Sequence, residues 1–160
     1  MNFPDNMLFI EKPEHFNPIF EVVSLFCEFN GKILLLLRRE GKSEGGKWGV
    51  PAGKREESDK SLLDATIREL NEETGIELKS KNVNYFLKTF VRFPDYDFIY
   101  HIFHTKLDKF PEVEVRADEH QDFLWVTPKG ALRMNLVKDL DWCIRVFYNK
   151  KKGYYPARGN

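Results

Sequence analysis

One nonapeptide constrains the fold and chemistry of this chain more than any other stretch: Arg68-Glu69-Leu70-Asn71-Glu72-Glu73-Thr74-Gly75-Ile76. Three of its acids, Glu69, Glu72 and Glu73, are spaced so that an α-helix places them on one face, one turn apart. Like charges in that arrangement repel one another, whereas a hard divalent cation that takes oxygen ligands turns the repulsion into attraction. The triplet alone therefore fits two interpretations, a metal site and a solvated acidic face of a helix.

The residues around these acids predict a complete helix. Ser61 is a predicted N-cap with Asp64 three residues later, and Gly75 suits the position just past the last turn. A mostly apolar stripe is formed by Leu63, Ile67, Leu70 and Thr74. Because this stripe lies to one side of the acids, the helix can bury one face and present the acids on another.

Apolar runs on both sides of the helix predict strands. Residues 19–29 and 32–38 are joined by Asn30-Gly31, the strongest short-range signal for a hairpin with a type I′ turn. Residues 33–37 do not alternate, which predicts a strand buried on both faces. Further elements are expected as strands at 83–93, 97–107 and 122–127, a short helix opening at Pro128, and an amphipathic helix at 135–149.

We expect one domain, residues 1–160, because this length suits a single hydrophobic core. Residues 1–18 are expected to form an irregular lead-in with one short edge strand, and residues 150–160 a flexible surface tail. Cys27 and Cys143 are predicted to be buried free thiols of a reducing cytosol. The sequence has no recognisable signal peptide and no apolar run that spans a membrane, so a cytoplasmic protein is expected.

The charge composition limits the partners that this chain can hold. Lys+Arg and Asp+Glu are equal at 25 each. No overall positive field is therefore available to hold a polyanion, and no stable nucleic-acid partner is expected. A small anionic substrate remains possible, since it needs only local positive charge.

The segment from Gly53 to Ile76 resembles the Nudix box, whose pattern is G-x5-E-x7-R-E-U-x-E-E-x-G-U, with U a bulky aliphatic residue. The second half of the pattern matches without gaps from Arg68 to Ile76. Pro51-Ala52-Gly53-Lys54 is similar to the Pro-Gly-Gly-Lys that commonly opens the box. The order of hairpin, glycine-containing loop, helix, strands and late helix also resembles the Nudix family, so the resemblance covers most of the chain.

The first half of the box departs from the pattern by one residue. Counting forward from Gly53 places the first box glutamate at Asp59, whereas counting back from Arg68 places it at Lys60. A one-residue insertion in the loop just before Ser61 accounts for the difference and leaves the helix in register. Three acids are candidates to replace the missing glutamate: Glu56, Glu57 and Asp59.

The resemblance implies an α/β protein with the Nudix fold, an α/β/α sandwich with a mixed β-sheet. It also implies hydrolysis of a nucleoside diphosphate linked to another moiety, with Mg²⁺ or Mn²⁺ as cofactor. Bound cations neutralise a pyrophosphate, orient it and lower the pKa of a bound water. By the same resemblance, Arg68 braces a box carboxylate and Glu69 serves also as general base. The implied metal ligands are Glu69, Glu72, Glu73 and the carbonyl of Ala52.

Glu119 is a candidate for a fourth carboxylate at the same site. Residues 119–126 resemble the family's Glu-His-x-x-x-x-Trp-Val segment, and Trp125 fixes the register of the match. The resemblance assigns Glu119 as a metal ligand or as the general base, and the alternative is a plain loop acid in a charged stretch. His120 is interpreted as structural rather than as a ligand.

Substrate contacts are expected near the box and at one later turn. Arg38 and Lys54 are candidates to contact phosphates, with a solvated surface as the alternative. Trp48, Phe93 and Tyr96 are candidates to stack a base, which needs only a π-face, with a role in the core as the alternative.

The resemblance leads to one preferred reaction and two alternatives. The preferred substrate is a nucleoside triphosphate, oxidised forms included, that is cleaved to the nucleoside monophosphate and pyrophosphate. A nucleoside diphosphate sugar is the alternative substrate, and a non-catalytic nucleotide-sensing domain is the alternative function. The sequence leaves open the preferred base, the number of metals, the identity of the general base and whether the chain forms a homodimer.

Overall fold

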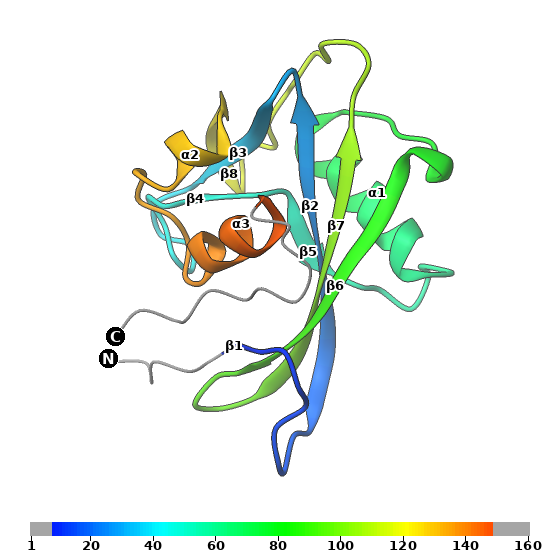
Figure 1. Cartoon of the computed structure of the whole chain (residues 1–160), viewed down its shortest axis with the longest axis vertical. Helices are drawn as coiled ribbons and strands as arrows, with labels where there is room; N and C mark the ends of the chain where they lie inside the picture. The colour runs from blue at the N-terminus through cyan, green and yellow to red at the C-terminus, as the bar shows by residue number, and fades with distance from the viewer. Residues whose placement is uncertain (1–7, 149–160) are drawn as a thin grey trace.

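The computed structural model describes residues 8–148, in which a mixed sheet lies between helices (Figure 1). The strands are β1 (Leu8–Phe9), β2 (Pro18–Phe29), β3 (Lys32–Arg38), β4 (Trp48–Gly49), β5 (Ala52–Lys54), β6 (Val83–Arg92), β7 (Asp97–Lys106) and β8 (His120–Val126). The helices are α1 (Leu62–Thr74), α2 (Pro128–Ala131) and α3 (Leu140–Tyr148), with a short 3₁₀ turn, η1 (Ser80–Asn82). Within the described range, no helix has the length and apolar character needed to cross a membrane.

The long strand β2 organises the sheet, whose order is β1-β6-β7-β2-β3-β4. β2 runs parallel to β7 and antiparallel to both β3 and the short β5. β8 pairs antiparallel with β3, and β6 pairs antiparallel with β7. Parallel and antiparallel pairs coexist, which confirms the expected mixed sheet.

The β2–β3 hairpin turns at Asn30 and Gly31, whose φ angles are 49° and 77°. Both angles lie in the left-handed region that a type I′ turn requires, so the hairpin predicted from the Asn-Gly pair is confirmed. Beyond the turn, residues 33–36 of β3 are completely buried. This burial matches the prediction of a strand covered on both faces.

Two hydrophobic cores cover the two faces of the sheet. On one face the strands pack against α3, through residues that include Phe26, Ile33, Leu35, Ile144 and Phe147. On the other face they pack against α1, through residues that include Val23, Leu25, Leu34, Ala65 and Leu70. Each of the larger side chains buried in this way contributes roughly 1.5–3 kcal/mol to folding. Figure 1 shows α1 and α3 on opposite sides of the central strands, which confirms the α/β/α sandwich.

Helix α1 begins and ends where its capping residues predict. The Oγ atom of Ser61 accepts a hydrogen bond from the N–H of Asp64 at 3.0 Å. Gly75 adopts a φ of 75°, and its N–H donates to the carbonyl of Asn71 at 2.8 Å. A cap such as Ser61 contributes about 1 kcal/mol. Because both ends are fixed, the directions in which the acids of α1 point are fixed as well.

Helix α3 begins later than the sequence pattern indicates, and the prediction for residues 135–139 was wrong. The N–H of Trp48 donates to the carbonyl of Asn135 at 2.8 Å, and the N–H of Val137 donates to the carbonyl of Trp48 at 2.9 Å. These backbone groups bind β4 and are not available to a helix, which starts at Leu140. Position 149 and the tail, 150–160, lie outside the described residues, as do residues 1–7 of the lead-in. The expected edge strand of the lead-in is β1, which pairs with β6.

Candidate active site

Helix α1 and the start of β8 bring three potential metal-ligating side chains together. Ligand atoms of Glu73, Glu119 and His120 all lie within 4.8 Å of one another, and we call this group the carboxylate–histidine cluster. Backbone hydrogen bonds hold the segments that carry it. The carbonyl of Glu119 accepts from the N–H of Arg39 at 2.9 Å, and the carbonyl of Glu73 accepts from the N–H of Arg116 at 3.2 Å. The cluster is therefore built on backbone that is fixed on both sides.

Glu73 is buried, with 4% of its surface exposed. Its Oε2 atom accepts a hydrogen bond from the N–H of Ala52 at 3.0 Å. Burial raises the pKa of Glu73 well above its usual value, the negative charge of Glu69 raises it further, and the Ala52 hydrogen bond opposes the rise. A cation that replaces the lost hydration would stabilise such a carboxylate.

His120 is equally buried, with 4% of its surface exposed. Its Nδ1 atom has no hydrogen-bond partner among residues 8–148. Burial lowers the pKa of His120 to about 4, and the positive charge of Arg38 contributes to this shift. The imidazole is therefore neutral at neutral pH and has an unshared electron pair on one nitrogen.

A second group, the arginine cluster, consists of Asp59, Arg68, Glu69 and Glu72. Arg68 binds Asp59 with two hydrogen bonds of 2.8 Å, from Nε to Oδ1 and from Nη2 to Oδ2. Its Nη1 atom donates to Glu69 Oε1 at 2.9 Å and to Glu72 Oε2 at 3.1 Å. A single guanidinium therefore hydrogen-bonds three acids through the planar fork that suits carboxylates, and its Nη1 atom also lies 3.6 Å from Glu56 Oε1.

Of the three candidate acids, Asp59 makes the closest contacts with Arg68. Asp59 is buried, and its hydrogen bonds with Arg68 lower the pKa of its carboxyl below the usual value. Its Oδ2 also accepts from the N–H of Glu56 at 2.8 Å, which closes the loop before α1. Lys60 is exposed. Of the two positions obtained by counting along the box, Asp59 and Lys60, Asp59 is thus the one that contacts Arg68. The one-residue insertion in the box therefore lies between Asp59 and Arg68.

Glu69 connects the two clusters and depends on the backbone of Gly53. Burial raises the pKa of Glu69, which the hydrogen bond from Arg68 partly offsets. The Glu69 carboxyl lies directly against Gly53, where an added Cβ would overlap with it. Glycine at this position of β5 therefore leaves the space that the Glu69 carboxyl occupies.

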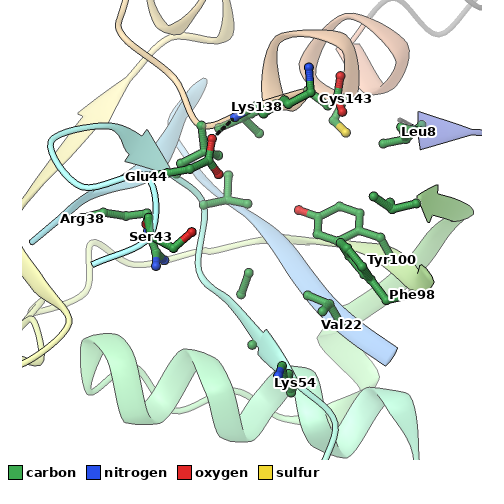
Figure 2. Close-up of a pocket in the computed structure, with 18 of the residues that line it drawn as sticks. Leu8, Val22, Arg38, Ser43, Glu44, Lys54, Phe98, Tyr100, Lys138 and Cys143 are labelled. Atoms are coloured by element: carbon green, nitrogen blue, oxygen red, sulfur yellow. Dashed lines mark hydrogen bonds between the residues drawn. The ribbon is translucent and has the colours of Figure 1, made fainter. Parts of the chain in front are cut away.

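A cavity of about 380 Å³ opens beside the carboxylate–histidine cluster. Glu73, His120, Ala52 and Gly53 contribute to its wall. Aromatic side chains from β2, from β7 and from the β6–β7 turn form another part: Phe20, Phe93, Tyr96, Phe98 and Tyr100. Figure 2 shows Arg38 and Ser43 across the cavity from Phe98 and Tyr100. The cavity thus combines a buried carboxylate, that of Glu73, with an aromatic surface.

Comparison with known proteins identifies the family. A profile of the NUDIX domain matches residues 19–147. The chain belongs to the NUDIX family. It is a Nudix hydrolase, and its relatives include the CTP pyrophosphohydrolase of Escherichia coli strain K12, which is 34% identical over 118 residues, 72% of this chain and 82% of the relative.

Solved Nudix structures are similar in fold. The E. coli ORF135 protein superposes with a TM-score of 0.67 and 30% identity, covering 81% of this chain and 89% of that one. The MutT protein of Methanosarcina mazei Go1 superposes with a TM-score of 0.71 and 26% identity, covering 84% and 98%. The NUDIX domain of Shewanella oneidensis NrtR, crystallised with ADP ribose, has a TM-score of 0.72 at 19% identity, which shows a shared fold.

The candidate substrate residues of this Nudix hydrolase divide into two groups. Arg38, Lys54, Phe93 and Tyr96 line the cavity. The Nζ atom of Lys54 lies 4.1 Å from the centre of the Phe20 ring, and Arg38 Nε donates to the Ser43 carbonyl at 2.6 Å. Trp48 is not among the cavity residues and packs instead into the core on the α3 face. This position agrees with the alternative prediction for Trp48, a role in the core.

The cavity residues that were not candidates from the sequence include Phe20, Glu44 and Asp139. Glu44 Oε1 accepts from the N–H of Lys138 at 2.7 Å, which joins the glycine-containing loop to the segment before α3 (Figure 2). The period-two pattern of a strand places Phe20 beside Val22 on one face. That pattern identifies the shared face but not the partner strand, since the parallel pairing with β7 joins residues about 80 positions apart.

Proposed function

We propose that this Nudix hydrolase is a divalent-metal-dependent pyrophosphohydrolase that converts nucleoside triphosphates, oxidised forms included, to nucleoside monophosphates and pyrophosphate. One observation carries the proposal. A single cavity is lined by two members of the carboxylate–histidine cluster, Glu73 and His120, and by an aromatic surface. A nucleotide has the matching halves, a polyanion that needs cations and a base that stacks on aromatic rings.

The residues present fit a divalent cation. Glu73 is a buried carboxylate next to Glu69 and Glu119, whose charges raise its pKa. A cation would relieve this repulsion with the oxygen ligands that Mg²⁺ and Mn²⁺ accept. The proposed ligands are Glu69, Glu72, Glu73, Glu119 and the carbonyl of Ala52. When bound, Mg²⁺ or Mn²⁺ would neutralise the pyrophosphate and lower the pKa of a water molecule.

The chain's own residues position the reaction. Water attacks a phosphorus atom of the anhydride, a new P–O bond forms, and the bond from that phosphorus to the bridging oxygen breaks. We assign Glu69 as the base that takes the proton of the water, with Glu119 as the alternative. Arg68 holds Oε1 of Glu69 at 2.9 Å and Asp59 holds Arg68 in turn. Arg68 is therefore a positioning residue in this scheme.

The aromatic surface supports a nucleotide rather than a bare polyphosphate. Phe20 stacks on Phe98 with ring centres 5.1 Å apart, and Phe93 packs edge-on against Tyr96 at 5.2 Å. Preformed aromatic surfaces of this kind bind a base with little loss of side-chain freedom. Arg38 and Lys54 supply the local positive charge for phosphates. The relative named CTP pyrophosphohydrolase supports a triphosphate as the substrate.

A panel of nucleotides with identified products tests the proposal. The panel contains nucleoside triphosphates, oxidised triphosphates, dinucleoside polyphosphates, nucleotide sugars and ADP-ribose, each with Mg²⁺, with Mn²⁺ or with a chelator. We expect triphosphates to yield monophosphate and pyrophosphate only when metal is present. Turnover of nucleotide sugars alone would replace the substrate in the proposal. A silent panel with tight, metal-independent nucleotide binding would show a sensor instead.

We also propose a reducing cytosol as the compartment of this enzyme. Cys27 is a free, buried cysteine, and Cys143 is buried as well. Buried unpaired thiols are usual where glutathione keeps cysteines reduced.

A further inference from the structure

We propose that His120 is a nitrogen ligand of the metal site, so that this chain has a mixed carboxylate–imidazole site that prefers Mn²⁺ to Mg²⁺. The inference rests on the metal-dependent function proposed above and assigns a further residue to that site. It departs from the structural role that the sequence indicated for this histidine.

Position is the first argument for His120. One of its ring nitrogens lies within 4.8 Å of carboxylate oxygens of both Glu73 and Glu119. Small side-chain rotations bring three atoms at such separations to ligand distances of about 2.0–2.3 Å from one ion. His120 is the first residue of β8 and pairs with Arg38 of β3. The imidazole is therefore carried by the sheet rather than by a free loop.

The second argument comes from a comparison with His101, a histidine that is buried to the same degree. His101 is 3% exposed and His120 is 4% exposed. Both ring nitrogens of His101 have partners, since Nδ1 lies 3.0 Å from the Tyr85 hydroxyl and Nε2 lies 3.1 Å from Glu21 Oε1. His120 Nδ1 has no partner within residues 8–148. A buried polar nitrogen without a partner is uncommon and calls for a ligand.

The third argument is the chemistry of the donor set. Carboxylates alone suit hard ions such as Mg²⁺, which also retains several waters. An imidazole nitrogen beside them raises the affinity for first-row transition ions over Mg²⁺, and Mn²⁺ accepts both donor types. His120 therefore sets the metal preference of the site, and the proposal concerns which ion binds rather than how the phosphate is cleaved.

Pulsed electron paramagnetic resonance on the Mn²⁺-loaded full chain tests the proposal directly. Electron spin echo modulation reports nitrogen nuclei bound to Mn²⁺, and nucleotide is left out so that no other imidazole-like nitrogen contributes. The wild-type chain is expected to show ¹⁴N modulation that changes when only histidine is labelled with ¹⁵N. In His120→Gln this modulation is expected to disappear, whereas in His101→Gln, the matched buried control, it is expected to persist.

Calorimetric titration measures the affinities of the wild-type chain and of His120→Gln for Mn²⁺ and Mg²⁺. The expected result for His120→Gln is a loss of about 10-fold or more in Mn²⁺ affinity and a smaller change for Mg²⁺. Mn²⁺ binding by the wild-type chain without any histidine signal would overturn the His120 assignment and leave the proposed function standing. A histidine signal that survives in His120→Gln would overturn it as well. If Mn²⁺ does not bind at all, both the His120 assignment and the proposed metal-dependent function are wrong.

Discussion

Asp59 of the arginine cluster and Glu73 of the carboxylate–histidine cluster are buried acids in opposite electrostatic states. In the first, Arg68 accompanies the acids, and the pKa of Asp59 is below its usual value. In the second, the described residues supply no comparable guanidinium contact, and the pKa of Glu73 is well above its usual value. Glu69 belongs to the first cluster by hydrogen bonding and acts on the second by its charge. The difference separates a buried acid whose charge is compensated by a guanidinium, Asp59, from one whose charge is not, Glu73.

The largest expected effect is on activity, from Glu73→Gln. The glutamine retains the shape of the side chain and an oxygen for the Ala52 N–H, but it is a poor ligand for a cation. We expect a loss of more than about 100-fold in kcat, since even groups one contact away from a metal contribute about 10–100-fold. Steady-state kinetics with Mg²⁺ on the best substrate of the panel measures this loss.

The control for Glu73→Gln is the same change at Glu77, which is exposed beyond the end of α1. Glu77→Gln is expected to retain full activity. A Glu73→Gln variant that is folded, as judged by circular dichroism, and still active would contradict the proposed role of Glu73.

The next largest effect is on stability, from Asp59→Ala in the arginine cluster. Removing Asp59 leaves the Arg68 guanidinium without its two shortest hydrogen bonds. Breaking a fully buried pair costs about 3–5 kcal/mol, and because Arg68 is 20% exposed we expect a loss of about 2–3 kcal/mol. Urea denaturation measures it, with Glu57→Ala in the same loop as an exposed control. Equal stabilities of the two variants would contradict a structural role for Asp59.

The two clusters are expected to respond to pH with opposite signs. Without metal, Glu73→Gln should be more stable than the wild type at pH 7, and this advantage should shrink as pH falls toward 4.5, where the wild-type carboxyl binds its proton in both states. The Asp59→Ala penalty should stay constant down to about pH 4 and shrink only below it, because Asp59 has a lowered pKa. Urea titrations in a chelator, from below pH 4 up to pH 7, test both. A stability advantage of Glu73→Gln that grows on acidification would contradict a raised pKa of Glu73 in the folded protein.

The smallest expected effect is that of Gly53→Ala. Its added Cβ would overlap with the Glu69 carboxyl, which is the free end of a side chain and can move aside. We expect nearly unchanged stability and a loss of about 10-fold in kcat, equivalent to about 1.4 kcal/mol of transition-state stabilisation. In a Glu69→Gln background, Gly53→Ala should cause no further loss of kcat. Additive losses would show that Gly53 acts independently of Glu69.

Local features of the fold were predictable because short-range chemistry determines them. The Asn30-Gly31 turn, the Ser61 cap and the Gly75 end of α1 each depend on residues within four positions of one another. The spacing of the box acids likewise fixes their relative directions on α1. These features require no knowledge of which strands pair.

Features that depend on distant pairing were not predictable. The competition between Glu56, Glu57 and Asp59 is decided by the path of a loop, which brings Asp59 alone into bidentate contact with Arg68. Trp48 matched the pattern of a base-stacking residue, but its backbone pairs with residues before α3 and its ring enters the core. Likewise, no local signal pairs Phe20 with Phe98, since the register of parallel strands is set by everything between them.

The parallel pairing of β2 with β7 also has a consequence for how the protein is made. It joins residues about 80 positions apart. Similarly, β3 pairs with β8, which carries His120 and comes much later in the sequence. Contacts of such long sequence separation form late because loop closure precedes any gain from them. A chain still emerging from the ribosome has the helix with its acids but not the strand that completes their surroundings. The proposed metal site is thus complete only after most of the chain has been synthesised.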